Sequence, residues 1–124
     1  MIDQHETERS AALDRARFHE VTNGNADMVQ ILAQTYSTDL RERLVVVEAA
    51  LEAGDLEEVI EMTHAIRGAS ANLGTGPVGE AASAIEQAGH DGDLQACRAG
   101  LPELVRRSEI LLEVFAEMLE QTRD

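Results

Sequence analysis

Apolar residues recur at steps of three and four positions through most of the chain, which is the spacing of one face of an α-helix. The longest run, at about 26–53, contains Val29, Leu32, Tyr36, Leu40, Leu44, Val47 and Leu51. The next, at about 56–73, contains Leu56, Val59, Thr63, Ile66, Ser70 and Leu73. Two further runs follow at about 77–88 and 94–119. The pattern predicts four substantial helices.

Residues that start and stop helices separate these runs. Asn25, Asp55 and Asp93 stand where a side-chain oxygen can cap the first turn of a helix, and Gly54 and Gly74 stand where a helix can end in a left-handed residue. The connections are short, so consecutive helices should be antiparallel neighbours. The predicted fold is therefore all-α: an antiparallel, up-and-down four-helix bundle.

The N-terminal part of the chain has a weaker pattern. Residues 10–21 carry apolar positions at helical spacing but too few for a full member of the bundle, and they predict a short helix that caps one end. Residues 1–9 are polar and predict a flexible N-terminus. The expected division is thus a tail at 1–9 and one domain at 10–122.

Composition narrows the classes of partner. The formal net charge of −14 would repel the phosphates of nucleic acids and anionic membranes, so a protein partner should present a neutral or basic surface. The single cysteine, Cys97, excludes an intramolecular disulfide and fits a reducing compartment. No basic leader or run of ~18 apolar residues is present, so we expect a soluble, cytoplasmic protein.

His64 is the main candidate for chemistry. It lies on the polar side of the predicted helix at 56–73, together with Glu57, Ile60, Glu61, Arg67, Gly68 and Ala71. A neutral imidazole on the outside of a rigid helix can attack a phosphoryl group in line. Arg67, one turn further on, could hold the phosphoryl oxygens, or it could be a solvated arginine.

Gly68 is a poor residue for a helix interior, where it costs ~1 kcal/mol relative to alanine. Its missing side chain could let a partner's loop reach His64, or it could allow close packing between helices.

The order His-Ala-Ile-Arg-Gly-Ala-Ser-Ala-Asn-Leu-Gly at 64–74 resembles the signature of histidine-containing phosphotransfer (HPt) domains. The resemblance covers roughly residues 12–120, including the approaches LEAGDLEEV and TNGNADMVQIL and the spacing from Gly74 to Glu86. The chain departs from the family at Arg67, where lysine is usual, at Thr63, where alanine is common, and at Ala82, where cysteine is frequent. None of these changes removes a group that the chemistry needs.

The resemblance implies a function in a phosphorelay. His64 would accept a phosphoryl group from an aspartate of a response-regulator receiver domain and pass it to another receiver, and a hybrid sensor kinase is a further candidate partner. The receiver would supply Mg²⁺, so this chain needs no cofactor of its own. No nucleotide-binding motif is present, so we expect a monomeric phosphoryl carrier without autonomous kinase activity.

The resemblance also suggests further site residues. Glu86 would accept a hydrogen bond from the imidazole, with Gln87 as a rival for that role, and Ile60, Glu61 and Ala71 would contact the receiver. His90 could line the edge of the site or be a loop histidine without a role.

Two alternatives remain open. Glu61 and His64 form the Glu-x-x-His pair of di-iron four-helix bundles, but only one copy exists and it projects away from the apolar face, so no metal site is expected. The chain could also be a catalytically silent helical interaction bundle. Whether His64 can be phosphorylated discriminates between these functions.

Overall fold

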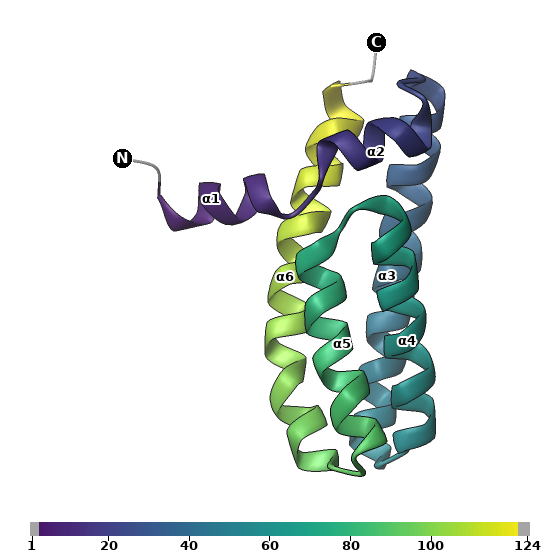
Figure 1. Cartoon of the computed structure of the whole chain (residues 1–124), viewed down its shortest axis with the longest axis vertical. Coiled ribbons are helices and arrows are strands. Elements are labelled where there is room, and N and C mark those ends of the chain that lie inside the picture. The colour runs from purple at the N-terminus through teal and green to yellow at the C-terminus, as the bar shows by residue number, and fades with distance from the viewer. Residues whose placement is uncertain (1–2, 122–124) are drawn as a thin grey trace.

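Four long helices form the body of the molecule in the computed structural model, which describes residues 3–121 (Figure 1). The helices in this range are α1 (Gln4–Ala11), α2 (Arg15–Thr22), α3 (Ala26–Ala53), α4 (Leu56–Leu73), α5 (Gly76–His90) and α6 (Leu94–Gln121). No β-strand occurs among the described residues. The predicted all-α four-helix bundle is confirmed.

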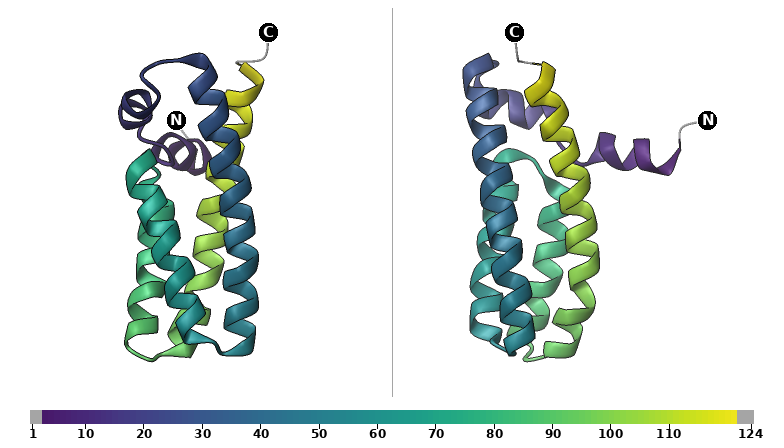
Figure 2. Two further views of the ribbon diagram at one scale, coloured as in Figure 1. Left: turned by 90° about the vertical axis from the view of Figure 1, so that its right-hand side faces the viewer. Right: turned by 180° about the vertical axis from the view of Figure 1, so that it is seen from behind.

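Helices that follow one another in the chain are neighbours in the bundle, and the last packs against the first. Helix α3 packs against α4, α4 against α5, α5 against α6, and α6 back against α3. The four helices run up and down along the long axis in both views of Figure 2. The two connections at one end, between α3 and α4 and between α5 and α6, are tight turns, as the short linkers predict.

The predicted caps define where the bundle helices begin. The side-chain oxygens of Asn25, Asp55 and Asp93 accept hydrogen bonds from the backbone N–H groups three residues further on, at 3.1, 3.1 and 3.0 Å. Gly54 and Gly74 are left-handed at the ends of α3 and α4, with φ of 73° and 83°. The local signals in the sequence and the tertiary structure therefore agree.

Aliphatic side chains fill most of the core, and one buried polar cluster ties three helices together. The Tyr36 hydroxyl on α3 lies 3.1 Å from Ser70 Oγ on α4 and 2.9 Å from Thr75 Oγ1 at the start of α5. The Tyr36 ring also packs edge-on against Phe115 of α6, with ring centroids 5.6 Å apart. This cluster fixes the end of the bundle at which α4 turns into α5.

The predicted single helix at 10–21 is wrong. The chain forms two helices there, α1 and α2, because buried Ala12 and Leu13 turn into the core and Asp14 caps a new helix. Helix α2 lies across the end of the bundle, and the Asp14 N–H donates to the Gly74 carbonyl at 2.7 Å (Figure 1). The expected capping element is thus α2.

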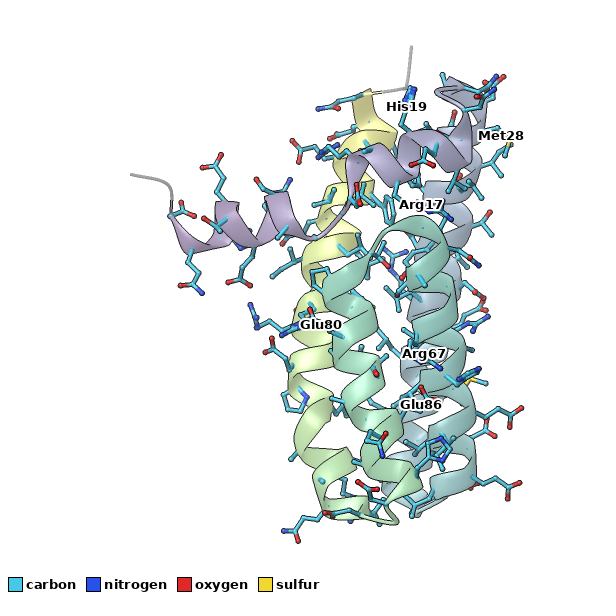
Figure 3. The ribbon with its side chains drawn as sticks, in the orientation of Figure 1. Arg17, His19, Met28, Arg67, Glu80 and Glu86 are labelled. Carbon is cyan, nitrogen blue, oxygen red and sulfur yellow. The ribbon has the colours of Figure 1, made fainter. Side chains whose placement is uncertain are left out.

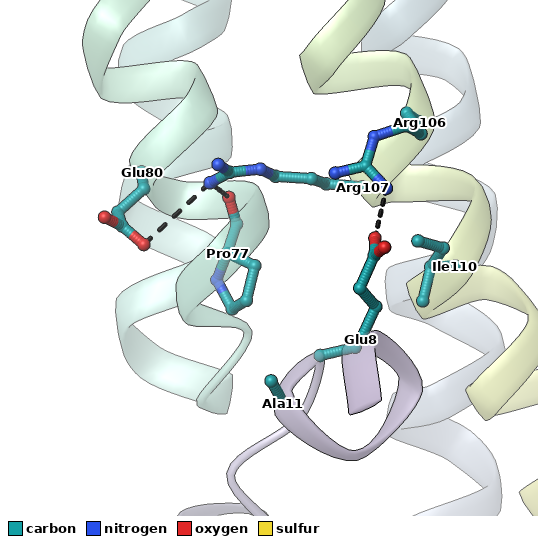
Figure 4. Close-up of a pocket in the computed structure, with 8 residues that line it drawn as sticks. Glu8, Ala11, Pro77, Glu80, Arg106, Arg107 and Ile110 are labelled. Carbon is teal, nitrogen blue, oxygen red and sulfur yellow. Dashed lines mark hydrogen bonds and ion pairs between the residues drawn. The ribbon is translucent and has the colours of Figure 1, made fainter. Parts of the chain in front are cut away.

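Helix α1 contains residues 4–9, which were expected to belong to a flexible tail. It projects sideways from the bundle, and none of its residues is buried (Figure 1). Ion pairs join it to α6: Glu8 to Arg106, and Arg9 to Glu113 and Glu117. Figure 4 shows the first of these beside a small hollow of about 210 Å³. The predicted limits at 1–9 and 10–122 also involve residues 1, 2 and 122, which lie outside the described residues.

Two glycines let α5 lie close to α4. A Cβ atom at Gly79 would be 3.0 Å from Ser70 Cβ, and one at Gly89 would be 2.7 Å from Ile60 Cγ1. Real Cβ atoms are rarely this close to a neighbour, so a side chain at either position would push the two helices apart. Within residues 3–121, no helix is both long and apolar enough to cross a membrane.

Candidate functional site

His64 projects from α4 into solvent. Its side chain is 63% exposed, whereas Thr63 and Ile66 of the same helix are buried. The Thr63 hydroxyl donates back to the Val59 carbonyl at 2.7 Å, so this polar residue is satisfied inside the bundle. The helix thus divides into the buried and exposed faces that the sequence pattern predicts.

Glu86 of α5 brings the candidate residues together. Its carboxylate accepts from His64 through Oε2, 2.9 Å from Nδ1, and from Arg67 through Oε1, 2.8 Å from Nε. Figure 3 shows Arg67 and Glu86 facing one another across α4 and α5. Only 11% of the Glu86 side chain is exposed, so this carboxylate is held between the two helices.

The environment of Glu86 decides its charge. Burial alone would raise the pKa of its carboxyl group, but the hydrogen bonds from Arg67 and His64, together with the charge of Arg67, lower the pKa below its ordinary value. Glu86 is therefore ionised at neutral pH and can only accept hydrogen bonds. His64 Nδ1 must carry the proton that it shares with Glu86, which leaves the lone pair on Nε2.

Arg67 also approaches the imidazole, with Nη2 3.0 Å from His64 Nδ1. A ring nitrogen that donates to Glu86 cannot also accept from an arginine, so this contact is not a hydrogen bond in that tautomer. The Arg67 side chain is 45% exposed. Its guanidinium therefore lies beside the imidazole with N–H groups still able to reach another acceptor.

The space around the imidazole is open. Apart from its two chain neighbours and the adjoining backbone of α4, no atom would lie within 4 Å of a Cβ at Gly68, so close helix packing does not account for this glycine. Glu61 and Ala71 are exposed on the same side of α4. Ile60 is half-buried because it lies against Gly89 of α5.

The two candidates for orienting the imidazole lie in different places. Glu86 contacts His64, whereas Gln87 is exposed and its side-chain nitrogen lies 3.3 Å from Asp91 Oδ1. His90 was expected in a loop, but it is the last residue of α5, one turn after Glu86, and its Nε2 lies 3.8 Å from Glu86 Oε2. The four-residue spacing from Glu86 could have revealed this neighbour in the sequence.

A shallow hollow of about 450 Å³ adjoins His64 between α4 and α5. Its lining residues are Glu57, Ile60, Glu61, His64, Glu86 and His90. Among residues 3–121, no group of three or more His, Cys, Asp or Glu side chains is arranged to hold a metal ion. The hollow is thus lined by two histidines, the Glu86 carboxylate that both approach, two further glutamates and one isoleucine.

Comparisons with known proteins identify the family of the chain. A family model described as the Hpt domain matches residues 31–124. The crystal structure of histidine-containing phosphotransfer protein B (HptB) from Pseudomonas aeruginosa PAO1 matches with a TM-score of 0.84 and 25% sequence identity, over 89% of this chain and 96% of that chain. No curated protein sequence matches significantly. The chain therefore belongs to the family of Hpt domains, the histidine phosphotransfer proteins of phosphorelays.

Proposed function

We propose that His64 carries the phosphoryl group in this phosphotransfer protein, accepting it from an aspartate of one receiver domain and passing it to an aspartate of another. The observation that carries the proposal is the hydrogen bond between His64 Nδ1 and Glu86, made while the His64 side chain stays 63% exposed. It orients the imidazole and leaves Nε2 free to act as a nucleophile. A silent interaction bundle would have no need of this arrangement.

The transfer step is an in-line displacement at phosphorus. The lone pair of His64 Nε2 forms the N–P bond as the P–O bond to the receiver aspartate breaks, and the electron pair of that bond leaves with the carboxylate oxygen. Positive charge develops on the imidazole, and the Glu86 carboxylate next to Nδ1 stabilises it. Attack by a second receiver aspartate reverses these changes, so the histidine is regenerated.

Arg67 would neutralise the transferred group. Its guanidinium lies beside the imidazole and can donate hydrogen bonds to phosphoryl oxygens. Glu86 holds it there through Nε, so the arginine needs little reorganisation when the phosphoryl group arrives. The same carboxylate thus positions both the nucleophile and the cation.

Access to His64 fits a partner protein rather than a small substrate. The open space at Gly68 and the exposed positions Glu61 and Ala71 leave room for a receiver loop above the imidazole, with Ile60 beside it. The receiver would bring the Mg²⁺ that its own aspartate chemistry needs. We place this exchange in the cytoplasm, with the chain acting as a monomer and with a hybrid sensor kinase as a further source of phosphate.

The test is phosphoryl transfer from a panel of purified receiver domains phosphorylated with acetyl phosphate. We expect the wild-type protein to gain one phosphoryl group, stable to alkali and lost in acid, and to return it to unphosphorylated receivers. His64→Gln should gain none while its circular dichroism spectrum stays unchanged, because the side chain is exposed. His19→Gln, which changes an exposed histidine in α2, away from the site, is the matched control. Phosphate on the His64→Gln protein in intact-mass measurements would contradict the proposal.

A further inference from the structure

The hollow beside His64 carries two carboxylates that nothing in the described chain balances. Arg67 pairs with Glu86, but within residues 3–121 neither Glu57 nor Glu61 forms an ion pair or a side-chain hydrogen bond. Both are exposed. The surface next to the nucleophile therefore has a local negative charge at the place where a phosphoryl group, itself an anion, must arrive.

These carboxylates cannot be avoided by a partner that reaches His64. Glu57, Glu61 and His64 follow one another at steps of four and three residues, so they lie along one side of α4. Glu57 is about 10 Å along the helix axis from His64, and Glu61 is about one turn away. A protein contact of standard size covers about 800 Å² on each partner, so a contact centred on His64 would also cover Glu57 and Glu61.

Covering unpaired carboxylates is unfavourable unless the partner supplies a cation. Removal of water from an ionised carboxylate costs more than a contact with neutral groups returns. Ile60, half-buried against α5, is the apolar residue that lines the hollow, and Glu57 and Glu61 are exposed beside it. An apolar residue next to two exposed carboxylates suits the aliphatic stem and charged head of a lysine or arginine.

We propose that Glu57 and Glu61 select the partner by pairing with a lysine or arginine side chain that the receiver places in this hollow. The inference rests on the proposed function, since it names the chemistry of the partner that docks on His64. The net charge of −14 for the whole chain acts in the same direction, because it favours a basic partner surface at long range. Receivers without a basic residue at this position would bind more weakly.

The experiment compares the Glu57→Gln/Glu61→Gln double variant with wild type, using the receiver in the same panel that has the lowest KM for wild type. In low salt we expect KM to rise about tenfold with little change in kcat, because the substitutions leave His64, Arg67 and Glu86 intact. In 0.5 M NaCl the difference should shrink to about twofold or less, since salt screens the lost attraction. Glu109→Gln/Glu120→Gln removes two exposed carboxylates of α6 and is the matched control, for which KM should stay near that of wild type.

The outcomes separate the two proposals. Normal transfer with the same KM and the same salt dependence in wild type and the Glu57→Gln/Glu61→Gln variant would overturn this inference alone. An equal rise of KM in the Glu109→Gln/Glu120→Gln control would also overturn it, because the effect would then come from net charge and not from the hollow. A wild-type protein that accepts phosphate from no receiver would overturn the proposed function, and this inference with it.

Discussion

Glu86 connects the side chains of the proposed site. It pairs with His64 and Arg67, and His90 lies within 3.8 Å of the same carboxylate oxygen that accepts from His64. A single buried carboxylate thus faces one permanent cation and two imidazoles. Because the pKa of Glu86 is lowered, its charge persists below the ordinary pKa of a glutamate, and the orientation of His64 should persist with it.

Gly68 gives a prediction in which stability and activity change in opposite directions. Gly68→Gln should raise the free energy of unfolding by about 0.5–1 kcal/mol, because a good helix former replaces glycine where no neighbouring helix lies within 4 Å of the new Cβ. The same substitution should slow phosphotransfer from a receiver at least about tenfold, because the longer side chain occupies the approach to His64.

Urea denaturation and transfer assays measure the two effects of Gly68→Gln. Ala99→Gln places the same residue at an exposed position of α6 and serves as the control, for which transfer should be unchanged. Normal transfer by the Gly68→Gln protein would show that the space at Gly68 is not used by the partner.

The choice between Glu86 and Gln87 could have been made from the sequence. Val78, Ala82, Ile85 and Gly89 define the buried face of α5, and at 100° per residue Glu86 borders that face whereas Gln87 points away from it. What the pattern could not supply is the register between α4 and α5. The contact between Glu86 and His64 depends on that register, which is set by packing over the whole length of both helices.

At the level of secondary structure, α1 and α2 contribute to the fold in different ways. Phe18 of α2 is buried and its ring lies 5.6 Å from that of Phe115. Helix α1 buries no residue and is held by ion pairs of partly exposed side chains, which are each worth about 0–1 kcal/mol. Helix α2 should therefore stabilise the bundle, whereas α1 is an appendage.

Deletion of residues 1–11 should lower the free energy of unfolding by no more than about 1–2 kcal/mol, because it removes only a few partly exposed ion pairs. Phe18→Ala should lower it by about 3–5 kcal/mol, as expected for loss of a buried aromatic ring. Urea denaturation of the two variants checks the contrast. A deletion that costs as much as Phe18→Ala would mean that α1 is an integral part of the bundle.

The four bundle helices were predictable because their apolar spacing and their caps indicate the same boundaries. The N-terminal pair was not predictable, because the chain breaks at the apolar residues Ala12 and Leu13, which the expected single helix at 10–21 would have contained. Leu13 is buried, but it belongs to the segment between α1 and α2 and not to a helix. Asp14, which caps α2 by accepting from the Arg17 N–H at 3.1 Å, is the local signal that could have revealed the break.

At the level of the whole molecule, charge opposes the compact state. The chain has 24 acidic and 10 basic residues, so folding brings many like charges together. Raising NaCl from about 20 to about 200 mM shortens the range of this repulsion and should raise the melting temperature by about 2–5 °C.

Scanning calorimetry at constant pH measures this shift in melting temperature. Sucrose at matched osmolality is the control for effects of solute that do not depend on charge. A melting temperature that falls with salt would mean that attractive ion pairs, such as those of Arg9 and Arg106, outweigh the repulsion.

The close approach of α5 to α4 limits how far Glu86 can move away from His64. Gly79 and Gly89 lie seven residues before and three residues after Glu86, so they set how close α5 lies to α4 on both sides of this residue. The hydrogen bond to His64 survives only a few tenths of an ångström of separation. Substitutions at these two glycines would therefore weaken the hydrogen bond that orients His64. If His64 carries the phosphoryl group as proposed, the accuracy of its placement depends on the spacing between two helices as much as on the residues that would touch phosphate.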